Sequence, residues 1–216
     1  MPLQMSKPTK QPTRTRPFWQ SCWSARSVVV VEVNGYEIGP GADLHGADLH
    51  GTKLYGTTAL SPANLEGANL SLANLEHVGL IEANLKGANL VGAHLHMADL
   101  TGANLQEASF IGACLSLALA VDADLTGANL TRADLEGARF QRANFEGADL
   151  VGANLYGANL YEANLKGANL KGANLYRTGF GRAILSGAHL GGAKANQDTR
   201  WPEGFDPKAA GVIFED

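Results

Sequence analysis

The sequence predicts an all-β fold in which the chain coils repeatedly on itself and the coils stack as a parallel ladder. Three observations predict it. From Leu60 to Leu190 every fifth residue is apolar, and of these 27 positions 22 are Leu, four are Phe and one is Ala. Two residues earlier, 24 of the 27 positions are Ala. The residue between is Asn or Asp at 17 of the 27 positions, so the repeating unit is Ala-(Asn/Asp)-Leu-X-X.

A period of five residues fits neither an α-helix nor a straight strand. Five steps along a helix turn by about 500°, so the Leu side chains would spiral around its whole surface. In a straight strand a step of five changes the face each time, and half of the Leu would face water. Ala and Leu two residues apart do share one strand face. A short extended segment followed by a two-residue corner therefore buries them all, with Gly easing the corner and stacked coils pairing their backbones.

The segments ANLEGANLSLANL and GADLVGANLYGANLYEANLKGANLKGANLY resemble the pentapeptide-repeat proteins, whose units read A(D/N)LXX. The resemblance covers roughly residues 41–193. It implies a right-handed quadrilateral parallel β-helix with four pentads per coil. Three units centred on Leu44, Leu49 and Leu54 precede the main run, with one residue inserted near Gly56–Thr58. About thirty units then give about 7.5 coils, which at ~4.8 Å per coil make a rod ~36 Å long.

The middle Leu or Phe of each unit and the preceding Ala are expected to point inward. Ala120 is the weak layer of this core, because it is small and its neighbours Leu117, Leu119 and Val121 are apolar at outward positions. Either the register shifts so that Leu119 fills the gap, or these apolar side chains lie outside. The expected core includes Leu65, Leu85, Leu105, Phe110, Leu130, Phe140, Phe145 and Leu165.

The segments outside the repeats predict a tail and two caps. Residues 1–26 hold five basic residues and no acidic one, which predicts a disordered basic tail or, alternatively, a targeting peptide. Residues 27–40 predict an N-terminal capping strand and a turn at Asn34-Gly35. Residues 194–216 predict a C-terminal cap, in which Trp201 and Phe205 plug the core and Asp206-Pro207 begins a short helical turn. The ending WPEGFDP looks like that of bacterial, especially cyanobacterial, members of the family.

Composition and motifs exclude several classes of function. The 216 residues include two Cys and carry a net charge of −4, which disfavours a disulfide scaffold and a nucleic-acid partner. No apolar run approaches the ~18 residues of a membrane span. The chain has no P-loop, nucleophile elbow, dinucleotide fingerprint or His-Glu-x-x-His motif. We therefore expect no enzyme and no cofactor, and a cytoplasmic protein unless the basic tail directs it elsewhere.

Four pentads per coil would align several outward apolar side chains into one patch. A contiguous apolar patch on a soluble rod is a candidate docking surface for a protein partner or for a second copy of the chain. The alternative is that β-branched residues there reflect strand propensity alone. The candidate partner surface consists of Ile81, Met97, Leu117, Leu119 and Val121.

Two polar features also invite a functional interpretation. The outward Asn and Asp residues are expected to bond to nearby backbone and to the residue stacked above, rather than to perform acid–base chemistry. The patch of His77, His94, His96 and Cys114 offers ligands for Zn or Cu, so metal binding there is one alternative function. Nothing in the sequence orients these imidazoles, and we predict no metal.

The leading hypothesis is a non-enzymatic structural or protein-interaction scaffold that presents flat faces to a protein partner. The resemblance also implies a DNA mimic that modulates a type II topoisomerase, as gyrase-protecting members of the family do. Charge argues against the mimic, since residues 41–193 hold 14 acidic and nine basic residues, a net of −5. B-DNA of ~36 Å carries about 21 charges.

Overall fold

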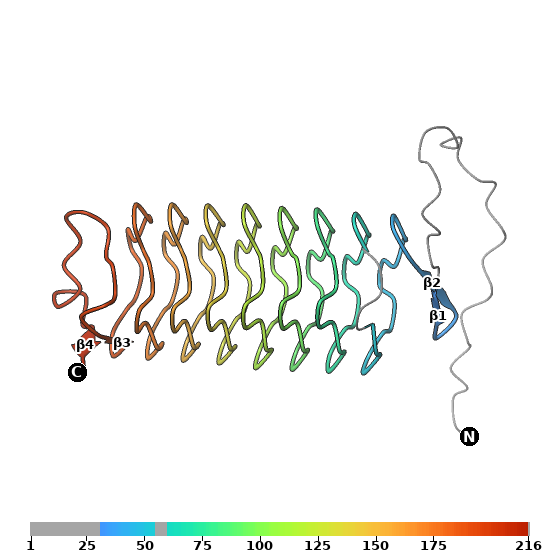
Figure 1. Cartoon of the computed structure of the whole chain (residues 1–216), viewed down its shortest axis with the longest axis horizontal. Helices are drawn as coiled ribbons and strands as arrows, with labels where there is room; N and C mark the ends of the chain where they lie inside the picture. Colours follow the sequence, from blue (N-terminus) through green and yellow to red (C-terminus); the bar gives the residue numbers. More distant parts are fainter. Residues whose placement is uncertain (1–30, 55–59, 216) are drawn as a thin grey trace, which may run out of the picture.

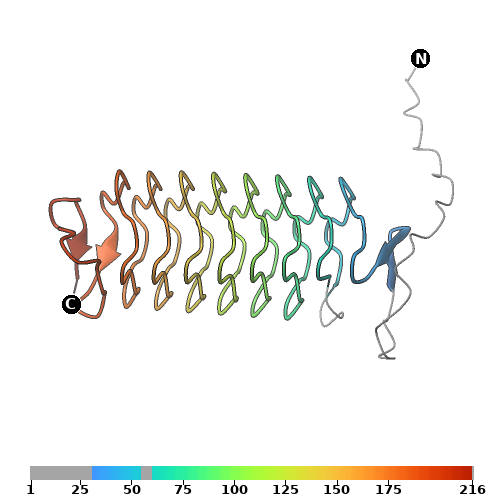
Figure 2. The ribbon, with the colours of Figure 1, turned by 90° about the horizontal axis from the view of Figure 1, so that it is seen from above.

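The computed structural model describes residues 31–54 and 60–215 and shows an elongated rod of stacked coils (Figure 1). The same coils seen from above keep an even spacing along the rod (Figure 2). Strands β1 (Val31–Val33) and β2 (Tyr36–Ile38) lie at one end, and β3 (Lys194–Ala195) and β4 (Ile213–Phe214) lie at the other. The basic tail predicted for residues 1–26 lies outside the described residues.

Neighbouring coils are joined by single parallel bridges, and in most of the rod the two paired residues are 20 residues apart. Asn84 pairs with Asn104, and Asn104 pairs with Asp124. The N–H of the following Leu also reaches the next coil, as where Leu105 donates to the carbonyl of Asp124 at 2.7 Å. Twenty residues are four pentads, so each coil has four sides, and this ladder satisfies the backbone without long strands.

The N-terminal bridges show where one residue is inserted. Asp43 pairs with Asn64, and Lys53 pairs with Asn74, both at an offset of 21 residues. From Asn64 onward the offset is 20, as in its pairing with Asn84. One extra residue therefore lies between Lys53 and Asn64. The predicted position of the insertion, Gly56–Thr58, falls outside the described residues.

From Gly67 to Gly192, each side of a coil ends in a corner whose second residue adopts a positive φ. Gly127 has φ +65°, its N–H donates to the carbonyl of Glu146 at 3.0 Å, and the next N–H, of Ala128, turns back to the carbonyl of Leu125. Gly adopts this left-handed conformation without steric cost. Other side chains occupy it as well, for example Leu117 at φ +57°. The ladder and the turn together impose the corner geometry whatever the residue.

The inward Leu, Phe and Ala side chains form one continuous core along the rod. The structure buries completely, at 0% exposure, Leu65, Leu85, Leu105, Phe110, Leu130, Phe140, Phe145 and Leu165. The rings of Phe140 and Phe145 meet edge to face, with centroids 5.0 Å apart. The core therefore consists of stacked apolar layers, with the small Ala residues beside the large ones.

At Ala120 the register continues without a shift. Ala120 is buried and its N–H donates to the carbonyl of Arg139 at 2.8 Å, as in a regular coil. Leu119 pairs with both Asp99 and Arg139 on the outside and is half-buried. Of the two expectations for this layer, the structure has the one in which the apolar neighbours lie outside. Phe140, one coil further along, follows Ala120 in the same inward column.

The two ends of the rod differ in construction. At the N-terminal end β1 and β2 form an antiparallel hairpin, in which Val33 pairs with Tyr36 around a turn at Asn34-Gly35. Ile38 of β2 is 2% exposed and belongs to the core. Within the described residues the strand begins at Val31, so the earlier part of the predicted strand is outside them.

At the C-terminal end β3 and β4 pair in parallel, with Lys194 opposite Ile213. Trp201 stacks on the last inward ring, Phe180, at 5.1 Å, and Phe205 stacks on Trp201 at 5.3 Å. The carboxylate of Asp206 accepts the N–H groups two and three residues later, at 3.0 and 3.1 Å. Residues 207–211 form a hydrogen-bonded turn there, without a helix assigned among the described residues.

Candidate interaction surface

Four apolar residues occupy neighbouring outward positions of the rod, which we call the apolar edge: Met97, Leu117, Leu119 and Val121. The last three are successive outward residues of a single coil. Met97 occupies the same corner one coil earlier, where its N–H donates to the carbonyl of Ser116 at 3.0 Å. Met97 is 47% exposed and Leu117 49%, so the edge presents flexible apolar side chains on a rigid backbone.

Ile81 does not join the apolar edge. It lies two coils before Val121 in the same column, with Thr101 in the coil between. The Thr101 hydroxyl donates to Asp99 at 2.6 Å. This polar pair separates Ile81, which is 40% exposed, from the other members of the predicted patch.

Leu72 is an exposed apolar residue that the sequence reasoning missed. It is 58% exposed and occupies a corner at φ +57°, as Leu117 does. A Cβ placed at Gly92 would lie 2.7 Å from Cδ2 of Leu72, and one at Gly137 would lie 2.7 Å from Cδ2 of Leu117. Each corner Leu therefore lies flat over a glycine of the next coil. The available signal was Leu at a corner position that Gly usually occupies.

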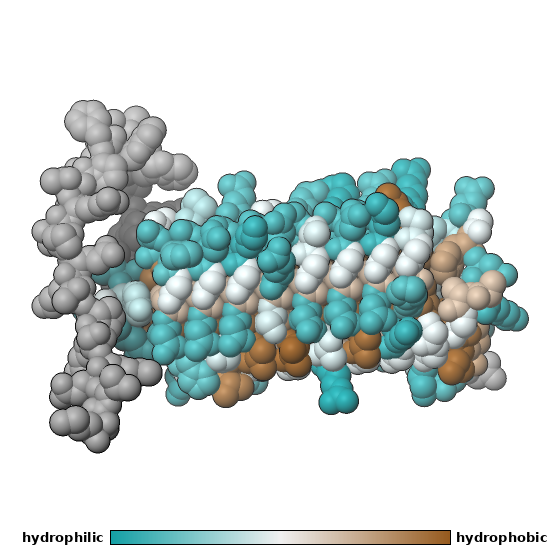
Figure 3. Space-filling view, turned by 180° about the vertical axis from the view of Figure 1, so that it is seen from behind, coloured by the Kyte–Doolittle hydropathy of each residue, from teal (hydrophilic) through white to brown (hydrophobic). Residues whose placement is uncertain are grey.

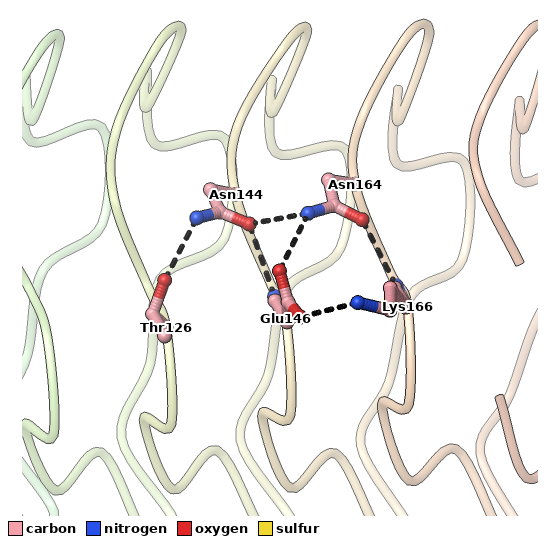
Figure 4. A network of polar contacts seen from close by, with 5 residues as sticks. All are labelled: Thr126, Asn144, Glu146, Asn164 and Lys166. Carbon is pink, nitrogen blue, oxygen red and sulfur yellow. Dashed lines mark hydrogen bonds and ion pairs between the residues drawn. The ribbon is translucent and has the colours of Figure 1, made fainter. Parts of the chain in front are cut away.

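The outward Asn and Asp residues form ladders along the faces of the rod. Asn144 Oδ1 accepts the N–H of Glu146 at 3.2 Å and the side-chain amide of Asn164 at 2.9 Å, and its own amide donates to Thr126 at 2.8 Å (Figure 4). Lys166 Nζ donates to Glu146 at 3.0 Å, and this hydrogen bond lowers the pKa of the Glu146 carboxyl. Both expected contacts, to backbone and to the stacked neighbour, are present, so these residues have structural partners.

Charged side chains alternate along the corner that follows the Ala120 column. Arg142 donates to both oxygens of Asp122, at 2.7 and 2.6 Å, and the hydrogen bond lowers the pKa of that carboxyl. Further along the same corner, Arg182 pairs with Glu162 at 3.2 Å. This row therefore alternates in sign instead of forming an acidic stripe.

The histidine and cysteine patch is spread over three successive coils, which hold His77, then His94 and His96, and then Cys114. His94 and Cys114 are bridge partners in neighbouring coils. The ring of His96 bonds to the hydroxyl of Ser116 at 2.8 Å and meets the ring of His77 edge to face, with centroids 6.0 Å apart. Across the part of the chain that the structure describes, no three His, Cys, Asp or Glu side chains are grouped so as to hold a metal ion.

An open hollow of about 800 Å³ lies near the C-terminal end, and we call it the C-terminal hollow. Two glycines at outward positions, Gly179 and Gly181, form its floor. The sequence signal for it was the loss of Asn or Asp at position 179, within Thr178-Gly-Phe180. The hollow is lined by Gly157, Ala158, Asn159, Tyr161, Arg177, Gly179, Gly181, Gln197, Asp198 and Arg200.

One face of the rod has a surface pattern that repeats along its length. Figure 3 shows pale rows of intermediate hydropathy flanked by hydrophilic rows on this face, with hydrophobic residues in small groups. In residues 31–54 and 60–215, no helix is long and apolar enough to cross a membrane.

Comparison with known proteins gives the following matches. The family model described as pentapeptide repeats matches residues 60–96, 83–119, 121–157 and 153–192. HetL, a pentapeptide repeat protein involved in heterocyst differentiation regulation from the cyanobacterium Nostoc sp. strain PCC 7120, is 36% identical over 71% of this chain and 80% of its own, with a TM-score of 0.44. The pentapeptide repeat protein alr5209 from Nostoc PCC 7120 is 33% identical over 56% and 84%, with a TM-score of 0.29.

A further solved structure resembles the chain in fold alone. QnrB1, a plasmid-mediated fluoroquinolone resistance protein, has a TM-score of 0.62 at 21% identity, over 73% of this chain and 81% of its own. No curated protein sequence matches the chain. The comparisons therefore agree with one another on repeat and fold.

Proposed function

The chain belongs to the pentapeptide-repeat family, and from that premise we propose that it is a non-enzymatic structural scaffold that binds a protein partner through its outer faces. Members of such repeat families vary their outer surfaces freely once the core is set, and the surface then decides the partner. We further propose that the rod is right-handed and has about 7.5 coils, and that the β1–β2 hairpin and residues 194–216 cap its ends. The proposed location of the protein is the cytoplasm.

The observation that carries the proposal is the apolar edge. Leu117 lies beside Met97 in the neighbouring coil and precedes Leu119 and Val121 in its own, so the four side chains are adjacent on a backbone held by the ladder. The core inside is filled by fully buried Leu and Phe. A rigid surface with exposed Met and Leu loses little conformational freedom of the backbone on binding, which favours a protein interface.

Charged substitutions on the apolar edge test the proposal. We expect Leu117→Glu and Val121→Lys each to weaken partner binding or self-association at least about tenfold, because a charge in a desolvated interface lacks a partner. The measurements are molar mass by light scattering and affinity capture from the native host.

Matched controls exist elsewhere on the rod. Leu72→Glu alters the same kind of corner, at the same φ of +57°, and Ile111→Lys alters an exposed β-branched residue on another face. Both controls should leave mass and captured partners unchanged. If the edge variants and the controls behave alike, the apolar edge is not the interface.

A DNA mimic that modulates a type II topoisomerase is the alternative function, favoured by the fold likeness to the fluoroquinolone resistance protein. Its weakness is charge, because Asp122, Glu146 and Glu162 each pair with a basic side chain of the next coil. A mimic needs rows of unpaired negative charge to replace phosphates. A gyrase supercoiling assay separates the two functions: inhibition or quinolone rescue at submicromolar protein would support the mimic.

Metal binding at the patch of His77, His94, His96 and Cys114 is the second alternative. Its support is the presence of these ligand types on neighbouring coils, where His94 pairs with Cys114. Elemental analysis of the purified protein tests it, and stoichiometric Zn or Cu that is lost in His94→Ala would favour it.

A further inference from the structure

The ladders of outward Asn residues follow a regular two-contact rule. Asn154 Oδ1 accepts the N–H of Tyr156 at 3.2 Å, and it also accepts the side-chain amide of Asn174 in the next coil at 2.9 Å. Asn174 in turn accepts the N–H of Tyr176 at 3.2 Å. Where two Asn residues are stacked in this way, the oxygen of each accepts the backbone N–H two residues later, and the NH₂ of the later Asn donates to the Asn one coil earlier.

Several rows interrupt this ladder, as where Ile184 follows Asn164, and one interruption lies in the row of Asn159 at the C-terminal end of the rod. Asn159 is followed in its row by Gly179 and then by Arg200, as the bridges between them show. Asn159 Oδ1 accepts the N–H of Tyr161 at 3.0 Å but receives no amide from the next coil, because Gly179 has no side chain. The N–H of Gly181, which that side chain would accept, has no acceptor among the described residues. In this row the carboxamide of the rung after Asn159 is therefore missing.

The place of the missing carboxamide is the floor of the C-terminal hollow. The side wall is the ring of Tyr161, since a Cβ at Gly181 would lie 3.1 Å from its Cδ2. Arg177 and Asp198 line the hollow too and pair with each other at 3.3 Å. Arg200 is exposed at the far end, and its guanidinium has no ion-pair partner among the described residues. The hollow thus combines three groups that a ligand could bind: the N–H of Gly181, the Oδ1 atom of Asn159 with a free lone pair, and the unpaired guanidinium of Arg200.

We propose that the C-terminal hollow binds a protein segment that presents an Asn or Gln carboxamide next to an acidic side chain. The carboxamide oxygen accepts the N–H of Gly181, its NH₂ donates to Asn159 Oδ1, and the neighbouring carboxylate pairs with Arg200. A carboxylate in the first position would meet the Asn159 oxygen without a proton to donate, so the site selects the amide. The inference rests on the proposed function only in taking a protein as the occupant.

The volume supports a segment rather than a single small molecule. An open hollow of about 800 Å³ exceeds what one side chain fills, and Arg200 lies one coil beyond Gly179. Adjacent residues of a bound segment would occupy the space between Tyr161 and Arg200. Backbone freedom lost by the segment keeps the affinity of a short peptide modest.

A peptide titration tests the site directly. The probe is N-acetyl-Glu-Asn-Glu-N-methylamide, added to ¹⁵N-labelled protein and followed by amide chemical shifts. We expect the Gly181 resonance to move with a Kd below about 1 mM. Replacing the Asn of the peptide by Ala or by Asp should weaken binding at least about tenfold, since the unpaired oxygen or N–H is then left without its partner.

Gly179→Asn supplies the missing carboxamide within the chain. Gly179 lies outside the left-handed region, and a Cβ there would be 4.0 Å from the nearest atoms, so the side chain fits. This variant should raise the Tm, slow hydrogen exchange of the Gly181 amide and abolish peptide binding. Gly179→Ala adds volume but no amide, and should keep exchange of that amide fast. Arg200→Ala should weaken the peptide about fivefold or more and reduce the dependence on salt.

The outcomes separate this inference from the proposed function. An unmoved Gly181 resonance, equal binding of the Asp peptide, or saturation by free asparagine with the same shifts would each overturn the inference. None of these outcomes bears on the apolar edge, because binding of its partner is tested separately by Leu117→Glu. Loss of the edge partner with an intact peptide site would conversely leave the inference standing.

Discussion

Leu115 and Leu117 are two residues apart in one coil and have opposite environments. Leu115 is 0% exposed in the core, whereas Leu117 is 49% exposed at a corner with φ +57°. Their hydrophobicity is identical. The difference teaches that the five-residue period, and not the residue type, decides which Leu is buried, because the ladder fixes where each position points.

The inward columns and the corners also differ in what they tolerate. The middle inward position of each unit holds almost only Leu and Phe, while the corners hold Gly or residues as different as Glu107, Leu117 and Arg142. A corner needs a backbone conformation, which Gly supplies without strain and other residues adopt at a cost. The middle inward position needs volume, which small residues lack.

Truncating both leucines tests whether the position in the repeat decides the contribution of a Leu to stability. Leu115→Ala should lower the free energy of unfolding by about 2–5 kcal/mol, since it leaves a cavity between stacked layers. Leu117→Ala should lower it by no more than about 1 kcal/mol, because half of the side chain faces solvent and the rest covers Gly137. Urea denaturation followed by circular dichroism measures both. Equal losses would show that the corner Leu contributes to packing.

The layer at Ala120 offers a test of volume within the inward columns. Phe140 occupies the same column one coil later, and both residues are fully buried. Ala120→Leu alone should cost about 1–3 kcal/mol through overpacking. Together with Phe140→Leu, the cost should fall below the sum of the single costs by about 0.5–3 kcal/mol, because the two residues share space.

The control for this coupling is Ala120→Leu combined with Leu170→Val, in a distant layer. That pair should be additive within about 0.5 kcal/mol. Additivity of the Ala120 and Phe140 changes instead would mean that the layers pack independently.

The sequence alone was enough to predict the inward positions and the all-β coil, because a period of five permits few backbones. It also predicted the two contacts of the Asn row, which follow from short polar side chains beside stacked backbone. The sequence analysis grouped Ile81 with Val121 because both lie in one outward column. It took no account of Asp99 and Thr101, the polar pair that lies between them.

The repeat pattern could not predict the C-terminal hollow, for a different reason. The repeat pattern ends at Ala193, and Arg200 enters the row of Gly179 at an offset of 21 residues rather than 20. A count of pentads therefore cannot place Arg200. Its position depends on how residues 196–199 fold, where the Thr199 hydroxyl donates to the carbonyl of Leu175 at 2.9 Å.

Exchanging Gly and non-Gly residues at the corners tests how much the positive φ costs. The expected changes in the free energy of unfolding are smaller than those in the core. Gly112 has φ +63° and open space around a Cβ, so Gly112→Ala should cost about 1 kcal/mol from backbone strain alone. Glu107 has φ +58°, and Glu107→Gly should be stabilising by about 0.5 kcal/mol, since relief of strain exceeds the added entropy of the unfolded chain. Thermal and urea unfolding of both variants measure the signs, and two losses of stability would contradict this account of the corner.

The smallest expected effect concerns Asp124, which stands where most ladder rungs carry Asn. Burial opposes its ionisation, but hydrogen bonds from Thr126, Gln106 and Asn144 outweigh burial and lower the pKa of the carboxyl. A lowered pKa in the folded state gives stability that is present above the unfolded pKa of about 3.9 and is lost as the pH falls through the folded pKa. Asp124→Asn should therefore be less stable than the natural chain at pH 7, and this difference should shrink below about pH 4.

Gln106 explains why Asn is not equivalent at this rung. Its side-chain amide donates to Asp124 Oδ2 at 2.6 Å, and in Asp124→Asn that oxygen becomes a second NH₂ donor. Gln106→Ala removes the conflict, so Asp124→Asn should cost less in that background than in the natural chain. Urea denaturation at pH 7 and pH 3 measures both differences. A stability difference that stays constant between these pH values would mean that the carboxylate acts in the ladder only as a neutral oxygen does.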